Sequence, residues 1–358
     1  MSVVQLIPGR SRGEGGVSAY AQALGAALSE HLGLGASLVS LGEAAENGAG
    51  AAGRGAAERR SPADRLDALA DAGGPSRVVL HYSNYGFEAR GCPTWLAPGL
   101  LRLKARGRET RLVTFFHEVY ATGPPWRSSF WLSPVQRSIA RRIAEASDAL
   151  ATSLPLYADL LGRWVERERV PVLPVFSTVG EPSSPPAFEA RAPSLVVFGT
   201  PGLRQRAYGE LRPALERACR ALGCEEIWDI GPPSELPGVR LGPSRIEALG
   251  LLPPREVSAR LAEARAGFLA YPAAFLPKSS VFAAYAAHGL LPVTAWRRDR
   301  RSGPLRDGEQ FLTVDRLETD RPACAEVARA AHAWYGRHSL ARQVEAFARL
   351  LGLPAAGR

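Results

Sequence analysis

Polar and charged residues gather at the start of one short apolar helix, and these residue types suit the binding of an anion. Residues 275–293 read FLPKSSVFAAYAAHGLLPV. Lys278, Ser279 and Ser280 lie at the expected amino end of the helix, where free backbone amides attract negative charge. Lys278 is one of only two lysines among 44 basic residues. The pattern predicts a phosphate-binding loop with Ser279 or Ser280 as N-cap and Gly289 as a left-handed stop. An ordinary capped core helix is the alternative.

Two other loops carry groups that suit a phosphate. The segment FGTPGLRQR is a predicted strand ending in a glycine turn that delivers Arg204 and Arg206, and a guanidinium can bind two phosphate oxygens at once. In GEGGVSAY, Gly15 and Gly16 allow backbone amides to approach an anion. This turn lacks the third glycine of G-x-G-x-x-G, which disfavours a dinucleotide site. The loops together predict a diphosphate ligand; surface arginines and a tight turn are the alternatives.

A further segment, FHEVYATGPPWRSSFWLSP, carries candidate catalytic and acceptor-side residues. His117 and Glu118 lie at the end of a predicted strand, and either could accept a proton from a hydroxyl; a structural His–Glu pair is the alternative. The zinc motif H-E-x-x-H fails at Ala121. Tyr120 and Trp126 are the expected acceptor-side residues. Aromatic residues interleaved with arginine suit stacking on a sugar or contact with a lipid interface, and a core position is the alternative.

Alternating strands and helices must position these residues. The expected strands are 3–7, 36–42, 77–83, 111–118, 148–153, 194–199, 226–231, 266–272 and the LLPVTA segment that begins at 290. The expected helices are 17–32, 133–147 with Ser133 as cap and Pro134 at its first position, 208–223, 254–264, the helix after Lys278, and 339–352. Short apolar strands separated by helices indicate parallel sheets covered on both faces.

The order of these elements predicts an α/β fold of two Rossmann-like, doubly wound domains that face each other across a cleft. Residues 1–176 form the expected acceptor-side domain, and residues 194–336 the donor-binding domain. Residues 177–193, rich in proline and serine, are the expected linker. Residues 337–358 form a closing helix. Ligands of such sheets bind beyond the carboxyl ends of the strands.

Composition narrows the class of protein. The chain has 358 residues, a net charge of +9 and four cysteines. The charge favours phosphorylated partners or an acidic membrane surface, with arginine-rich coding bias as the alternative.

The cysteines form no C-x-x-C motif, so reduced thiols are expected. The first residues lack the charged start and apolar core of a signal peptide, so none is expected, and no apolar run approaches about 20 residues. We expect a cytoplasmic protein, with peripheral membrane contact left open, and no nucleic-acid partner, because no basic stripe with interleaved aromatic residues is evident. Residues 43–60 are of low complexity and suit a surface excursion.

In the order and spacing of its segments the chain resembles the retaining family-four glycosyltransferases of GT-B architecture. GGVSAYAQALGAAL is similar to their first loop and helix, and SDALATS to the strand that closes their N-terminal domain. VVFGTPGLRQR resembles their donor loop, AAYAAHGLLPV their E-A-x-A-x-G-x-P-V pattern, and LRDGEQFL their D-G-x-x-G-x-L turn. The family's two glutamates, eight positions apart, align with Leu276 and Ala284, so both carboxylates are missing.

The resemblance implies a hexosyltransferase-like enzyme of carbohydrate metabolism or polysaccharide biosynthesis. It would transfer sugar from a nucleotide-diphosphate sugar to a glycan, lipid-linked or small-molecule acceptor, with retention of configuration. Arg204, Arg206, Lys278 and the amides at Ser279 and Ser280 would stabilise the leaving diphosphate. No cofactor and no metal are expected, since no D-x-D motif presents paired carboxylates. The alternatives are a non-catalytic nucleotide-sugar or glycan-binding relative that lost its glutamates, and a sugar-nucleotide epimerase.

Overall fold

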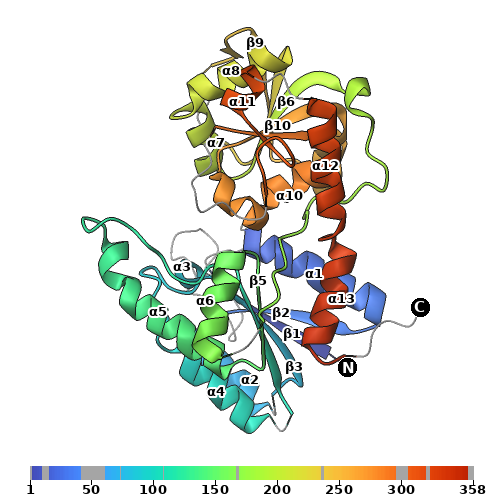
Figure 1. Cartoon of the computed structure of the whole chain (residues 1–358). Coiled ribbons are helices and arrows are strands. Elements are labelled where there is room, and N and C mark those ends of the chain that lie inside the picture. The colour runs from blue at the N-terminus through green and yellow to red at the C-terminus, as the bar shows by residue number, and fades with distance from the viewer. Residues whose placement is uncertain are drawn as a thin grey trace, which may run out of the picture. The chain divides into compact units, whose positions relative to one another are not determined.

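The chain forms two compact α/β units in a computed structural model, which describes residues 2–9, 16–41, 61–72, 74–107, 109–166, 169–234, 238–295, 305–319 and 323–353. One unit comprises residues 1–173 with 340–358, and the other residues 174–339 (Figure 1). Each unit is a mainly parallel sheet flanked by helices, which confirms the predicted pair of Rossmann-like units. Gly15 and residues 43–60 of the sequence predictions lie outside the described residues.

The first unit contains a five-stranded parallel sheet in the order β2-β1-β3-β4-β5. The strands are β1 (Ser2–Ile7), β2 (Gly35–Ser40), β3 (Arg77–Tyr82), β4 (Arg111–Phe116) and β5 (Ala149–Thr152). Apolar side chains of the central strands are buried on both faces, as expected for a parallel sheet covered by helices. All five strands coincide with predicted ones.

Seven helices belong to this unit: α1 (Gly16–Leu32), α2 (Pro62–Asp71), α3 (Asn84–Phe87), α4 (Leu96–Arg106), α5 (Ser128–Ala146), α6 (Pro155–Val165) and α13 (Leu340–Leu350), counted over the described ranges. The prediction that Pro134 begins a helix is wrong, because α5 starts at Ser128 and holds Pro134 inside. The closing helix α13 lies beside α1 (Figure 1), where the Tyr20 hydroxyl donates a buried 2.9 Å hydrogen bond to Gln343 Oε1.

The second unit contains a seven-stranded sheet in the order β12-β11-β10-β6-β7-β9-β8, parallel except for the β8–β9 pair. The strands are β6 (Ala192–Phe198), β7 (Glu226–Ile230), β8 (Arg240–Leu241), β9 (Ser244–Gly250), β10 (Ala264–Leu269), β11 (Leu291–Thr294) and β12 (Leu312–Thr313). Its α-helices are α7 (Pro201–Tyr208), α8 (Arg212–Leu222), α9 (Pro254–Glu263), α10 (Ser280–Ala287), α11 (Val314–Thr319) and α12 (Cys324–Gly336), with short 3₁₀ turns η4 (Phe188–Ala190) and η5 (Ala273–Lys278).

The segment 177–193, expected to be a linker, belongs to the second unit. Arg191 explains this placement: it is 3% exposed and donates hydrogen bonds to backbone carbonyls of this unit, including those of Ala264 and His288. A charged side chain held in this way fixes the segment to the sheet and helices around it. The chain passes from one unit to the other at 173/174 and returns at 339/340.

Each sheet has a topological switch point, where the chain turns from one side of the sheet to the other. In the first unit β1 lies between β2 and β3, and in the second β6 lies between β7 and β10. Open parallel sheets bind ligands outside the carboxyl ends of the strands at such points. The turns after β1 and β6, and the segments after β3, β4 and β10, are therefore the places where functional groups are expected.

Candidate functional site

The amino end of α10 lies at the switch point of the second unit and has the predicted cap. Ser279 Oγ accepts a 3.2 Å hydrogen bond from the Phe282 amide. At the other end Gly289 has φ +68°, the left-handed stop that its sequence position predicted. The preceding turn η5 brings Lys278 to the start of the helix, where its ammonium lies 5.7 Å from the centroid of the Phe275 ring.

Tyr285 fixes α10 against the sheet. Its buried hydroxyl donates to the Val196 carbonyl at 3.1 Å and accepts from the Phe198 amide at 3.1 Å, both on β6. On β10, Gly267 leaves room for the ring, because a Cβ there would lie 2.4 Å from Tyr285 Cε2. The helix is thus seated across β6 and β10, and its amino end, including Ser280, is placed at their carboxyl ends.

A small cavity of about 10 Å³ marks this switch point. It is lined by residues from the ends of β6 and β10, from α7 and from the start of α10: Val197, Phe198, Leu203, Ala207, Phe268, Leu269, Ala270, Tyr271, Ser279 and Val281. Such a volume holds about one water molecule. The cavity is therefore too small to enclose a larger ligand.

Arg204 does not have the place that the sequence suggested. Instead of a glycine loop, residues 201–208 form α7, and Arg204 points into the unit with 2% of its surface exposed. Its Nε donates to Asp229 Oδ1 at 2.9 Å, its second terminal nitrogen to Asp229 Oδ2, and the other to the Pro232 carbonyl. We correct its role from diphosphate ligand to buried support of the turns after β6 and β7. Asp229 gave no signal in the sequence analysis.

Arg206 lies on the outer side of α7 and stays a predicted phosphate ligand. Its side chain is 47% exposed and its Nε lies 3.7 Å from Glu210 Oε2. Leu276 and Ala284, the positions of the family's two glutamates, are 0% and 1% exposed. Neither side chain reaches solvent. Lys278 is the charged residue closest in sequence to the start of α10.

In the first unit, His117 and Glu118 directly follow β4, which ends at Phe116, two residues earlier than the predicted strand. His117 is 8% exposed, and its Nε2 lies 3.2 Å from His81 Nδ1. Glu118 is half-buried, and its Oε2 accepts a 3.2 Å hydrogen bond from Ser83 Oγ. The two residues therefore interact with different partners. Sequence analysis missed His81, although a histidine within the apolar run RVVLHY was a detectable signal.

The remaining predicted residues of this unit lie at separate places. Gly16 is the first residue of α1, at the carboxyl end of β1. Tyr120 is half-buried and its ring lies 6.4 Å from that of Trp164, so it packs on the core. Trp126 is 83% exposed, just before α5. Trp126 therefore stays a predicted acceptor-side residue, whereas Tyr120 is packed on the core.

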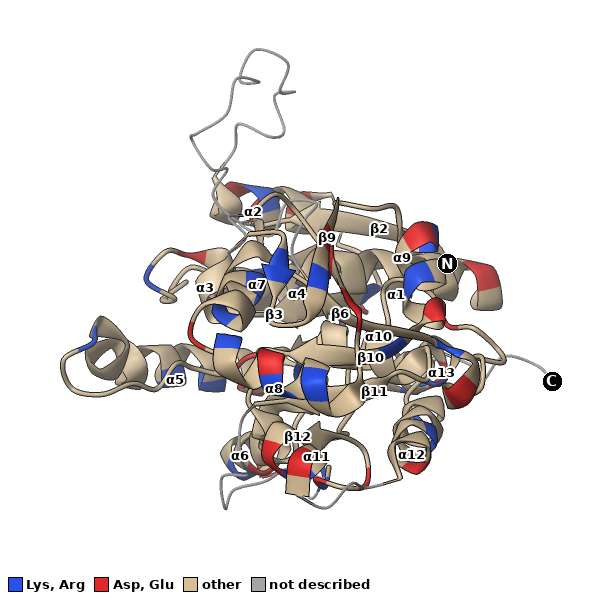
Figure 2. Cartoon of the chain, turned by 90° about the horizontal axis from the view of Figure 1, so that it is seen from above, with Lys and Arg blue, Asp and Glu red and all other residues tan. Residues whose placement is uncertain are grey.

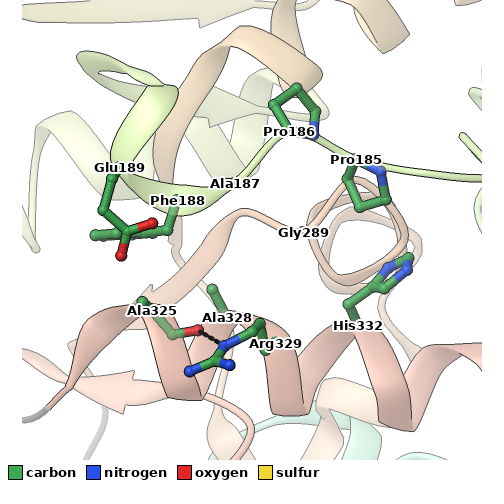
Figure 3. A pocket seen from close by; sticks show the side chains of 10 residues that line it. All are labelled: Pro185, Pro186, Ala187, Phe188, Glu189, Gly289, Ala325, Ala328, Arg329 and His332. Carbon is green, nitrogen blue, oxygen red and sulfur yellow. Dashed lines mark hydrogen bonds between the residues drawn. The ribbon is translucent and has the colours of Figure 1, made fainter.

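A second cavity, of about 550 Å³, lies elsewhere in the second unit, where the sequence gave no signal (Figure 3). Glu189 comes from η4, while Arg329 and His332 come from α12. The Arg329 Nε donates to the Ala325 carbonyl at 3.3 Å, and His332 Nδ1 lies 3.1 Å from the Ala286 carbonyl. This cavity borders Gly289, before β11 begins, and thus lies toward the amino ends of the strands, away from the switch point.

Neither a candidate metal cluster nor a membrane-spanning helix is found among the residues that the structure describes. These residues include no cluster of three or more histidine, cysteine or acidic side chains that could hold a metal ion. No described helix has the length and hydropathy needed to cross a membrane.

Comparison with known proteins shows similarity in structure alone. No protein-family model and no curated protein sequence matches the chain. An S. aureus MnaA–UDP co-structure has a TM-score of 0.58 at 13% identity, covering 100% of both chains. The apo form of the lipopolysaccharide outer core galactosyltransferase WaaB has a TM-score of 0.53 at 10% sequence identity, and the match covers 98% of this chain and 99% of that chain. The chain has the GT-B fold. A candidate UDP-N-acetylglucosamine 2-epimerase from Listeria monocytogenes also has a TM-score of 0.53, at 14% sequence identity. This match covers 100% of this chain and 99% of that chain.

Proposed function

We propose that this GT-B chain is a glycosyltransferase that uses a nucleotide-diphosphate sugar as donor. The observation that carries the proposal is the capped amino end of α10, with Lys278 beside it, at the switch point between β6 and β10. Free amides of a helix start and a neighbouring ammonium suit a diphosphate. The acceptor would be a glycan, a lipid-linked sugar or a small molecule, and retention of configuration follows from the family resemblance.

Each group has a distinct part in this proposal. Lys278 and the Ser280 amide stabilise the negative charge that develops on the leaving diphosphate. The Ser279 amide, predicted for the same part, donates instead to the Leu276 carbonyl at 2.9 Å. Arg206 adds a second positive charge from α7. In the first unit, His117 and Glu118 orient hydroxyl groups. We expect neither a metal nor a cofactor to be needed.

A thermal-stability screen with nucleotide sugars and free nucleoside diphosphates tests the donor site. A ligand at 100 times its dissociation constant stabilises the protein by about 2.7 kcal/mol. We expect a selective rise in melting temperature with one nucleotide, followed by sugar transfer when an acceptor is added. If no nucleotide or nucleotide sugar stabilises the protein, the donor site as proposed is wrong.

Lys278→Ala should weaken binding of the identified nucleoside diphosphate by about tenfold, since a hydrogen bond to a charged group contributes about 1.5–3 kcal/mol. The measurement is calorimetric titration of the diphosphate. Lys104→Ala is the matched control, because Lys104 forms an ion pair with Asp148 at 2.7 Å in the first unit. Equal affinity of wild type and Lys278→Ala would remove Lys278 from the site.

A sugar-nucleotide epimerase is the second candidate, favoured by the full-length similarity to the Listeria protein. An epimerase changes the donor without an acceptor, so NMR spectra of the donor incubated with the protein alone separate the two activities. A non-catalytic binding protein is the third candidate, favoured by the buried, uncharged positions 276 and 284. It would show stabilisation by the nucleotide sugar with neither transfer nor conversion.

We also propose that the start of α5 rests on the inner membrane surface, where a lipid-linked acceptor would lie. Trp126, Phe130 and Trp131 are 83%, 42% and 70% exposed. Exposed arginines follow along the same helix, and basic positions of α5 are blue in Figure 2. Aromatic side chains insert at the headgroup level, and arginines attract anionic lipids.

Sedimentation with vesicles tests the membrane contact. The protein should bind phosphatidylglycerol-containing vesicles and much less to pure phosphatidylcholine. Trp126→Ser/Trp131→Ser should reduce the bound fraction several-fold. The matched control is Val239→Ser/Leu251→Ser, because these side chains are 77% and 67% exposed in the second unit. Equal loss with both double variants would assign the binding to general surface hydrophobicity and contradict the proposal.

A further inference from the structure

A buried line of hydrogen bonds crosses three strands of the first unit and ends at His117. It joins Gln5 on β1, His81 on β3 and His117 directly after β4. Gln5 Oε1 lies 2.8 Å from His81 Nε2, and His81 Nδ1 lies 3.2 Å from His117 Nε2. Gln5 and His81 are 0% exposed. Buried polar side chains of this kind are retained only when their hydrogen bonds are satisfied.

The strand register explains why the three side chains meet. Gln5 pairs with Val79, and His81 lies two residues further along β3. His81 in turn pairs with Phe115, and His117 lies two residues further along the chain. Residues two apart on a strand point to the same face. The line therefore stays on one face of the sheet and moves one step toward the carboxyl edge at each strand.

The donors and acceptors along this line can be assigned. Gln5 Nε2 donates to the Ala21 carbonyl at 2.8 Å, because a carbonyl oxygen only accepts. Gln5 Oε1 is therefore the acceptor for His81 Nε2–H. Burial lowers the pKa of His81 to about 3, so the ring is neutral at neutral pH. A neutral imidazole with its proton on Nε2 has a lone pair on Nδ1, and that atom accepts from His117 Nε2–H.

Aromatic rings hold His117 in this orientation. The ring centroids of Tyr20 and Phe115 lie 5.2 Å and 4.6 Å from that of His117, both in edge-to-face geometry. Tyr20 is itself tied to Gln343 on α13 by its hydroxyl. The imidazole thus has a fixed plane as well as a fixed partner for Nε2, and both constraints come from side chains outside the predicted site.

We propose that Gln5 and His81 are positioning residues that hold His117 as its Nε2-protonated tautomer. The tautomer is a property of the protein alone, and only its effect on sugar transfer rests on the proposed glycosyltransferase function. Because His81 is neutral, it fixes the tautomer without supplying the negative charge of a carboxylate partner.

Nitrogen-15 NMR of the histidine side chains tests the tautomer directly. In the wild-type protein, His117 should show one tautomer with the proton on Nε2. The six histidines of the chain are few enough for assignment by single substitutions. A proton on Nδ1, or a mixture of tautomers, in the folded wild-type protein would overturn the proposal without any variant.

Two substitutions of His81 then separate positioning from structure. His81→Leu removes the acceptor and should give a mixture of tautomers at His117. His81→Asn keeps an acceptor, Oδ1, near the place of Nδ1 and should restore the single tautomer. An unchanged His117 tautomer in a folded His81→Leu variant would contradict the proposal.

If transfer activity is found, His81→Leu should lower kcat by about tenfold or more with the donor KM little changed, and His81→Asn should recover most of the lost kcat. Absence of transfer in the wild type contradicts the proposed function but leaves the NMR result decisive for the tautomer.

Discussion

Replacing Arg204 with alanine should lower the free energy of unfolding of the second unit by about 3–5 kcal/mol, the usual cost of removing one partner of a buried ion pair. The side chains of Arg204 and Asp229 are 2% and 0% exposed. Truncation leaves the Asp229 carboxylate buried without its cation. It also removes a packing partner of the turn after β7. Gly231 in this turn lies so close to its neighbours that a Cβ there would be 2.3 Å from the Gly199 carbonyl oxygen and 2.8 Å from an Arg204 terminal nitrogen.

Hydrogen exchange in increasing urea, followed by mass spectrometry of peptides from each unit, measures this loss separately for the two units. Arg206→Ala is the matched control on the same helix, and its exposed side chain should contribute within about 0.5 kcal/mol. Replacing both partners, as Arg204→Met/Asp229→Leu, should recover much of the stability, since no unpaired charge remains. Unchanged stability of ligand-free Arg204→Ala, together with lost diphosphate binding, would instead support the role first predicted from the sequence.

The strands and the parallel character of the sheets were accessible from the sequence, because a parallel sheet buries both faces. Runs such as SVVQLI and RVVLHY are mainly apolar, with four apolar residues in six, and this makes them recognisable as buried strands without any partner. The end signals of α10 were equally local: a serine that caps the first turn and a glycine with positive φ after the last. Such features depend on a few neighbouring residues, so a single sequence is enough to predict them.

Features that depend on distant contacts were missed. The turn predicted after β6 is the helix α7, because Pro201 occupies the first helical turn, where proline is tolerated. The helical period then turns Arg204 inward to Asp229, a partner 25 residues away. Pro134 was predicted to begin a helix, but it lies inside α5. In the same way, the line from Gln5 through His81 to His117 depends on the register of three strands, which no single segment determines.

Arg191→Met should destabilise the second unit by at least about 3 kcal/mol, because it leaves several buried carbonyl groups without donors. Five carbonyls accept from the guanidinium, those of Pro186, Leu261, Ala262, Ala264 and His288. Burial lowers the pKa of Arg191 to about 10, so the group remains a cation at neutral pH. Among the residues that the structure describes, no carboxylate pairs with it, and backbone carbonyls are its counterpart.

The position of these carbonyls explains why a cation is stable there. Leu261 and Ala262 lie in the last turn of α9, and His288 is the C-cap of α10. The carboxyl ends of helices carry partial negative charge, and their last carbonyls lack intrahelical donors. Arg191→Lys should recover only part of the loss, since an ammonium has three donors and cannot reproduce the planar fork. Arg255→Ala, on the exposed start of α9, is the control and should change stability by less than about 0.5 kcal/mol. Equal exchange rates for second-unit peptides of Arg191→Met and wild type would show that the two helix ends are held by other contacts.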